Sequence, residues 1–121
     1  MIDYEINEFG KRLGLPGLEL NGSGLASLVL DGVGTLTIEK TSDFMKRELL
    51  LTLSQPIEPT DSARFGRLLA NVNWRRRPAF KLSPAFFRHH LILTARFDED
   101  GVTAALLENA LRVMADEIGR A

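Results

Sequence analysis

The sequence contains no cysteine, which excludes a disulfide framework, a thiolate nucleophile and any metal site built on cysteine. It also lacks an excess of charge of either sign, because 15 basic and 16 acidic residues leave a formal net charge of −1. No global electrostatic field therefore favours binding to nucleic acid or to an anionic membrane. No stretch approaches the roughly 18 consecutive apolar residues that a membrane-spanning helix needs, so we expect no membrane insertion.

The N-terminal segment, MIDYEINEFGKR, is acidic and amphipathic, whereas a secretory signal has a basic start and an apolar centre. Together with the lack of cysteine, this leads us to expect a cytoplasmic protein. The apolar content of 45% is typical of a folded protein. A chain of 121 residues is long enough for one domain with a hydrophobic core, so we expect a single domain over residues 1–121.

Three β-rich runs lie close together, at residues 25–30, 35–39 and 48–53. The dipeptide Asp31-Gly32 between the first two runs is favoured in the type I′ turn of a hairpin. Apolar residues alternate with the others in the second and third runs, which indicates strands with one buried face. These features predict a three-stranded antiparallel meander.

Helical spacing of apolar residues appears in three segments, at residues 3–13, 61–73 and 103–119. Thr60 or Asp61 is a plausible N-cap for the second of these helices. Two further strands are expected at residues 79–82 and 89–97, with a turn at Ser83-Pro84 between them. The sequence thus predicts an α+β fold, in which helices pack on an antiparallel twisted sheet in the order α-βββ-α-ββ-α.

No cluster of residues indicates catalysis or a metal site. His89 and His90 are neighbours in a predicted strand, where adjacent side chains face opposite ways and do not line one site without a bulge. The acidic turn at residues 98–101 lacks the alternating ligands of a calcium loop. Three arginines at residues 75–77 are too few, in a nearly neutral chain, to predict nucleic-acid binding. We expect no enzymatic activity, no metal and no cofactor.

A group of apolar residues falls outside the predicted buried stripes. Leu50 and Ile92 lie on the strand faces opposite their core neighbours, and five large side chains lie in turns or at the ends of elements. These five are Phe44, Met45, Trp74, Phe86 and Phe87. As a group on a small domain they favour a surface used for association with another chain. The alternative is that helices cover both faces of the sheet and that the aromatic residues close its ends.

The order of elements, together with five residue runs, resembles the class I type III secretion chaperones of the CesT, or Tir chaperone, family. The resemblance covers nearly the whole chain. It is carried by FGKRLGLPGLEL (residues 9–20), LVLDGVGTLTIE (28–39), ELLLTLSQPI (48–57), GRLLANVN (66–73), and the closing strand and helix.

This resemblance implies a small, non-catalytic cytoplasmic protein that acts as a dimer. Its cargo would be a secreted effector or gatekeeper protein, whose N-terminal segment wraps the chaperone in extended form. The implied cargo-binding candidates are Ile6, Phe9, Leu13, Leu36, Ile38, Leu50 and Ile92. The implied dimer-interface candidates are Phe65, Leu68, Leu69, Val72, Trp74, Phe80 and Leu82.

Physically, a disordered cargo segment can add a strand to an exposed sheet edge and place apolar side chains in pockets. A homodimer and a heterodimer with a second chaperone are both compatible with the sequence. The main alternative function is a regulatory or adaptor domain of the same architecture that binds a folded protein. A small enzyme or ligand carrier that uses the region of His89 and His90 is a third alternative.

Overall fold

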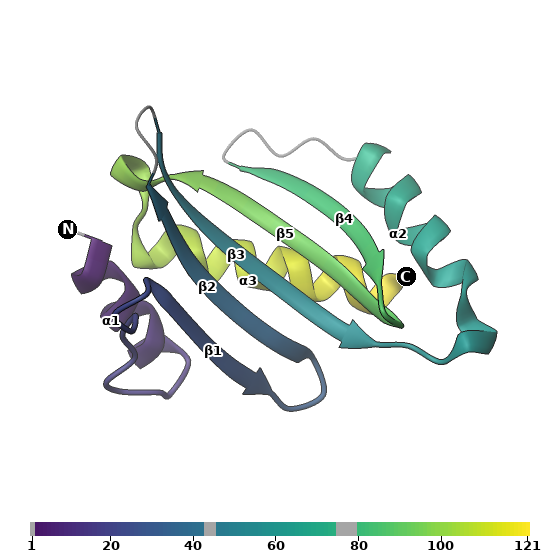
Figure 1. Ribbon diagram of the computed structural model, residues 1–121, viewed down its shortest axis with the longest axis horizontal. Helices are drawn as coiled ribbons and strands as arrows, with labels where there is room; N and C mark the ends of the chain where they lie inside the picture. Colours follow the sequence, from purple (N-terminus) through teal and green to yellow (C-terminus); the bar gives the residue numbers. More distant parts are fainter. Residues whose placement is uncertain (1, 43–45, 75–79) are drawn as a thin grey trace.

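The computed structural model describes residues 2–42, 46–74 and 80–121. Their order confirms the predicted α-βββ-α-ββ-α arrangement in a single domain (Figure 1). The elements are α1 (Ile2–Arg12), β1 (Leu25–Leu30), β2 (Gly34–Ser42), β3 (Arg47–Pro56), the 3₁₀ turn η1 (Pro59–Asp61), α2 (Ala63–Trp74), β4 (Lys81–Phe87), β5 (His90–Asp98), the 3₁₀ turn η2 (Glu99–Gly101) and α3 (Ala104–Arg120).

The five strands form an antiparallel sheet in the order β1-β2-β3-β5-β4. After β3 the chain leaves the sheet and forms α2. It returns as β4 at the outer edge, and β5 then fills the place between β3 and β4. The two edges of the sheet are therefore β1, near the start of the chain, and β4, which follows α2. Figure 1 shows α1 beside β1, α2 beside β4 and α3 passing behind the sheet.

The two faces of the sheet have different chemistry. One face, here called the helix face, carries buried side chains such as Leu36, Leu51 and Leu93, and the three helices pack against the same core. The other, here called the open face, carries a row of hydroxyl side chains across all five strands. The row consists of Ser27, Thr37, Thr52, Thr94 and Ser83. No described helix crosses the open face, so the alternative with helices on both faces is wrong.

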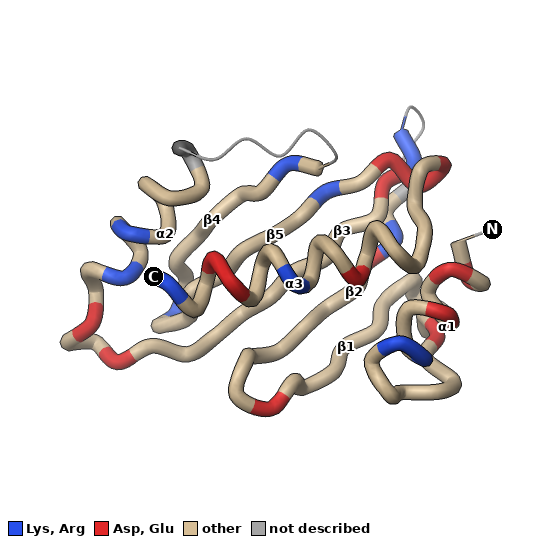
Figure 2. Tube along the Cα trace, turned by 180° about the vertical axis from the view of Figure 1, so that it is seen from behind, with Lys and Arg blue, Asp and Glu red and all other residues tan. Residues whose placement is uncertain are grey.

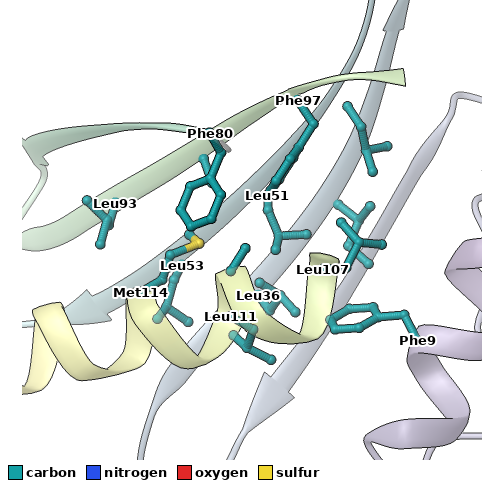
Figure 3. Packing of buried hydrophobic residues seen from close by; sticks show 14 of the residues in the cluster. Phe9, Leu36, Leu51, Leu53, Phe80, Leu93, Phe97, Leu107, Leu111 and Met114 are labelled. Carbon is teal, nitrogen blue, oxygen red and sulfur yellow. The ribbon is translucent and has the colours of Figure 1, made fainter. Parts of the chain in front are cut away.

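The hydrophobic core lies between the sheet and the helices (Figure 3). Phe9 of α1 and both Leu107 and Met114 of α3 are fully buried there. The rings of Phe80 and Phe97 are 5.5 Å apart between centroids, at the β4 side of this core. Burying one such large side chain contributes roughly 1.5–3 kcal/mol, so this core is the main source of stability.

A polar contact joins α1 to the start of α3. The side chain of Thr103 accepts a hydrogen bond from the Leu106 amide at 3.1 Å, as expected of an N-cap. The Glu5 carboxylate accepts a second one from the Ala104 amide at 2.9 Å. A carboxylate at a helix N-terminus is also favoured by the helix dipole. This contact fixes the position of α1 beside the sheet.

The predicted turn at Ser83-Pro84 is wrong, because both residues lie inside β4. The turn between β4 and β5 is formed instead by Arg88 and His89, with φ of 49° and 62°. Such left-handed backbone usually selects glycine or asparagine, so no turn signal marked this position in the sequence. Proline at an edge strand is tolerated when its nitrogen faces away from the ladder.

Three smaller predictions also need correction. Only Gly32 of the Asp31-Gly32 pair has a positive φ, at 74°, and the loop includes Val33, so the turn is not type I′. The helix α2 begins at Ala63 after η1, so neither Thr60 nor Asp61 is its N-cap. The strand β3 continues through Pro56 rather than ending at Leu53. Phe44, Met45 and the arginines at 75–77 lie outside the described residues.

Candidate protein-binding surfaces

The two histidines lie together at the tip of the β4–β5 hairpin and are both exposed. His90 Nδ1 is 2.9 Å from the carbonyl oxygen of Arg88, which is a contact within the turn. Within residues 2–42, 46–74 and 80–121, no group of three histidines or carboxylates is placed to hold a metal ion.

The seven predicted cargo-binding residues do not come together on one exposed surface. Four of them are fully buried in the core, namely Ile6, Phe9, Leu36 and Ile38. The other three are half-buried: Leu13 packs against the core at the end of α1, while Leu50 and Ile92 lie on the open face. A role in cargo binding stays a prediction for all seven. Only Leu13, Leu50 and Ile92 have side-chain surface that a bound segment could contact directly.

The β1 edge is apolar and carries none of the usual protection against strand pairing. Its sequence, LASLVL, has no charge and no proline, and Val29 is 74% exposed. The Lys40 amide donates to the carbonyl of Gly24 at 2.8 Å, which sets the hydrogen-bonding alternation of the β1–β2 ladder. This alternation turns the backbone N–H and C=O groups of Leu25, Ser27 and Val29 away from β2.

These three residues differ in whether their outward groups are already occupied. Both outward groups of Leu25 are hydrogen-bonded to Asn21. The backbone amide of Asn21 donates to the Leu25 carbonyl at 2.9 Å, and the Leu25 amide donates to the side-chain Oδ1 of Asn21 at 3.1 Å. In the described part of the chain, the outward groups of Ser27 and Val29 have no such partner. The β1 edge thus presents two donors and two acceptors to an added strand.

The β4 edge has a different structure. A two-residue turn joins Phe87 to His90, so these two residues form a hydrogen-bonded pair. The alternation then turns the backbone groups of Leu82, Pro84 and Phe86 away from β5. Because Pro84 has no N–H, the central donor of this edge is missing. The β4 edge is a poor template for strand addition.

The predicted dimer-interface residues divide between core and surface. Leu68, Val72 and Phe80 belong to the core, Phe65 and Leu82 are half-buried, and Leu69 is 38% exposed. The side chain of Trp74 lies outside what the structure describes. A role in dimerisation stays a prediction for the whole set, and a charge at Val72 would test folding rather than association.

Exposed apolar side chains gather on α2 and β4, beside the edge that is closed to strand addition. Leu69 projects from α2, and Phe86 and Phe87 at the end of β4 are 44% and 61% exposed. The rings of Phe65 and Phe86 are 6.2 Å apart, so α2 and β4 form one continuous surface. We call Phe65, Leu69, Leu82 and Phe86 the α2–β4 surface. The sequence placed Phe86 in the group that favours association, but not among the dimer-interface candidates, because the predicted strand ended at Leu82, before the turn expected at Pro84.

A half-buried arginine, Arg64, links α2 to α3. Arg64 donates to the carbonyls of Ile118 and Ala121 at 3.0 and 3.1 Å, and to Gln55 Oε1 at 2.6 Å. It therefore donates to carbonyls at the C-terminal end of α3, where the Ile118 carbonyl also accepts from the Ala121 amide at 3.4 Å. Gln55 in turn donates to the Val33 carbonyl at 3.0 Å. This network gives the α2–β4 surface a rigid support.

In the described part of the chain, Lys and Arg positions are interspersed with Asp and Glu positions rather than gathered in one patch of a single sign (Figure 2). On the open face, Arg96 of β5 lies 3.5 Å from Glu48 of β3. The Nζ atom of Lys40 lies 3.6 Å from Oε1 of Glu99. Each described helix lacks either the length or the apolar character needed to span a lipid bilayer.

The model of the Tir chaperone protein (CesT) family matches residues 5–120 of the sequence. This chain belongs to that family. The match covers all the elements described above, from within α1 to the end of α3. It confirms the resemblance seen in the sequence: the protein is a member of a family of type III secretion chaperones. No curated protein sequence matches the chain at a significant level.

Solved structures show the same fold at low sequence identity. The Yersinia pestis type III secretion chaperone SycH, in complex with a stable fragment of YscM2, matches with a TM-score of 0.74 and 19% identity, over 99% of this chain and 98% of that one. The ExsC–ExsE complex matches with a TM-score of 0.70 and 20% identity, over 97% and 87%. The HopA1–SchA chaperone–effector complex matches with a TM-score of 0.67 and 12% identity, over 95% and 88%.

Proposed function

We propose that this CesT family member is a non-catalytic cytoplasmic chaperone that binds the extended N-terminal segment of a type III secreted effector or gatekeeper protein. Binding keeps the cargo segment soluble and competent for secretion. The family supports the chaperone role. Among the solved relatives, SycH is bound to a fragment of another protein and SchA to an effector, which supports a polypeptide as the ligand.

The observation that carries this proposal is the open β1 edge. The outward groups of Ser27 and Val29 provide two donors and two acceptors to an extended segment. Each backbone hydrogen bond contributes roughly 0.5–1.5 kcal/mol net. Ordering a disordered segment costs several kcal/mol, so the complex stays reversible and the cargo can be handed to the secretion machinery.

The protein acts as a dimer through the α2–β4 surface. Leu69 and Phe86 expose apolar area there, and Arg64 holds α2 rigidly against α3. A second copy can place the same surface against this one in a two-fold symmetric contact. This arrangement separates the two tasks, since the dimer contact occupies one end of the sheet and leaves β1 at the other end accessible.

The test is purification from the native cell, with identification of the bound proteins by mass spectrometry and measurement of the mass of the complex. We expect a complex that contains two chaperone chains, either identical or from two chaperones, with a secreted protein. The isolated N-terminal segment of that protein should bind as well as the whole protein does. A chaperone that ignores this segment and binds only a folded protein would contradict the proposal and favour the regulatory or adaptor alternative.

A further inference from the structure

Asn21 closes one end of the β1 edge with a compact set of hydrogen bonds. Its side-chain Oδ1 accepts from the Ser23 amide at 2.8 Å and from the Leu25 amide at 3.1 Å. Its backbone amide donates to the Leu25 carbonyl, and its carbonyl accepts from the Gly24 amide at 2.9 Å. A single residue thus occupies both outward backbone groups of the first residue of β1.

We propose that Asn21 is a positioning residue that sets the register of the polypeptide strand added to β1. This inference rests on the proposed function, because it concerns how the cargo segment is aligned once it binds. With Leu25 occupied, an incoming strand finds available groups only at Ser27 and Val29. The loop at residues 31–33, which turns the chain into β2, ends the edge on the other side.

Such a boundary matters because the outward groups of β1 recur every two residues. With Leu25 occupied, the added strand cannot shift by two residues to pair with Leu25 and Ser27 in place of Ser27 and Val29. In an antiparallel pair, residues that lie directly across from Ser27 and Val29 point to the open face. The residue between them then points to the helix face beside Leu28, which is half-buried against the core.

The ligand chemistry follows from this alignment. The position beside Leu28 favours an apolar side chain, because it adds to the apolar surface of the core. The positions across from Ser27 and Val29 accept polar side chains, since the open face is accessible to water. The ligand is therefore an extended segment in which an apolar residue lies between two residues of any polarity. The apolar residue lies beside Leu28, and the two flanking residues lie across from Ser27 and Val29.

The experiment compares the wild-type protein with Asn21→Ala and Asn21→Asp by amide hydrogen exchange in solution. The probe is a short synthetic peptide in which valine alternates with threonine between terminal lysines, added at millimolar concentration. Asn21→Asp is the conservative control, because its carboxylate oxygen still accepts from the Ser23 and Leu25 amides. In wild type without peptide, the Leu25 amide should already exchange slowly, whereas the Ser27 and Val29 amides should exchange quickly.

On addition of peptide, we expect protection of Ser27 and Val29 in wild type and in Asn21→Asp. In Asn21→Ala the Leu25 amide should exchange quickly without peptide and become protected with it. The peptide should then bind about two- to tenfold more tightly, which is the effect of one added backbone hydrogen bond. If the peptide protects the same amides in all three proteins and binds them with equal affinity, the role proposed for Asn21 is wrong, but strand addition at β1 is supported. If it protects no β1 amide in any of them, strand addition at β1 is itself contradicted.

Discussion

The two edge strands of the sheet, β1 and β4, are both short and antiparallel to their neighbours, yet they expose different groups. The β1 edge has free backbone donors at Ser27 and Val29 and no proline. The β4 edge lacks its central donor because of Pro84, and the exposed apolar area lies beside it on α2 and at Phe86. One edge can pair through its backbone, whereas the other is suited to side-chain packing.

Under the proposed function, this difference lets one small domain bind a cargo segment and a second copy without competition between them. A strand added to β1 gains directional hydrogen bonds and tolerates many side chains. A surface packed through Leu69 and Phe86 depends on shape and apolar burial, and therefore selects one partner. The comparison predicts that substitutions at one end of the sheet leave the function of the other end intact.

The largest effect is expected at the α2–β4 surface. The double substitution Leu69→Glu with Phe86→Glu should raise the dimer dissociation constant by on the order of 100- to 1,000-fold, because each central apolar anchor contributes about 2 kcal/mol. Sedimentation equilibrium measures this constant. Tyr4→Glu is the matched control, because Tyr4 is an exposed apolar residue on α1 at the other end of the sheet. A double variant that remains fully dimeric would place the dimer contact elsewhere.

The next largest effect is expected at the β1 edge. Proline at both Ser27 and Val29 removes the two outward donors but leaves the inward ladder to β2 intact. Cargo affinity should fall by roughly 10- to 100-fold, as two backbone hydrogen bonds are lost. Titration calorimetry with the cargo segment measures this affinity. The control is alanine at the same two positions, which changes the side chains but retains the backbone donors. Equal losses in the proline and alanine variants would show that side chains, not backbone groups, carry the binding.

A pair of glycine substitutions compares the packing at the two ends. A Cβ at Gly10 of α1 would lie 2.5 Å from Leu18 Cβ and 2.8 Å from the Leu15 carbonyl oxygen, whereas nothing lies within 4 Å of one at Gly66 of α2. Gly10→Ala should therefore lower the free energy of unfolding by about 1–3 kcal/mol. Gly66→Ala should raise it by about 0.5–1 kcal/mol, because alanine is the better helix former.

Both glycine variants are best made in the Leu69→Glu background, so that dimerisation does not contribute to the measured stability. Urea denaturation followed by circular dichroism gives the free energies. The same sign of change at both positions would contradict the packing described for the loop that follows α1.

The smallest effect is expected at Pro84. Threonine at this position restores the missing outward donor of β4 and turns the edge into a template for pairing. We expect weak, concentration-dependent association beyond the dimer, visible by sedimentation velocity, with cargo affinity at β1 unchanged. If Pro84→Thr instead leaves the protein strictly dimeric, the proline is not what protects this edge.

Much of the fold followed from sequence patterns. The period-two runs in β2 and β3 and the helical spacing in α3 are strong signals, because the same residues both favour the element and bury its face. The β4–β5 hairpin was misplaced because Pro84, a turn signal, lies in an edge strand. Its true turn consists of Arg88 and His89, two residues that rarely adopt positive φ.

The binding surfaces were harder to predict, for a physical reason. Periodicity shows which residues share a face but not whether a helix covers that face. Phe9 and Leu36, which the family resemblance implied as candidates for a groove, are core residues. The β1 edge depends on backbone groups, whose accessibility is set by which strand lies beside them. That neighbour relationship is a property of the topology and leaves no mark in the sequence of β1.

The most direct test of the account is a measurement of nuclear Overhauser effects between backbone protons of the bound cargo segment and those of the sheet. We predict contacts from one continuous stretch of the segment to Ser27, Leu28 and Val29, which would define an added strand at β1. Backbone contacts to β4, or side-chain contacts to the helices alone, would contradict the claim that this chaperone captures its cargo by extending its sheet.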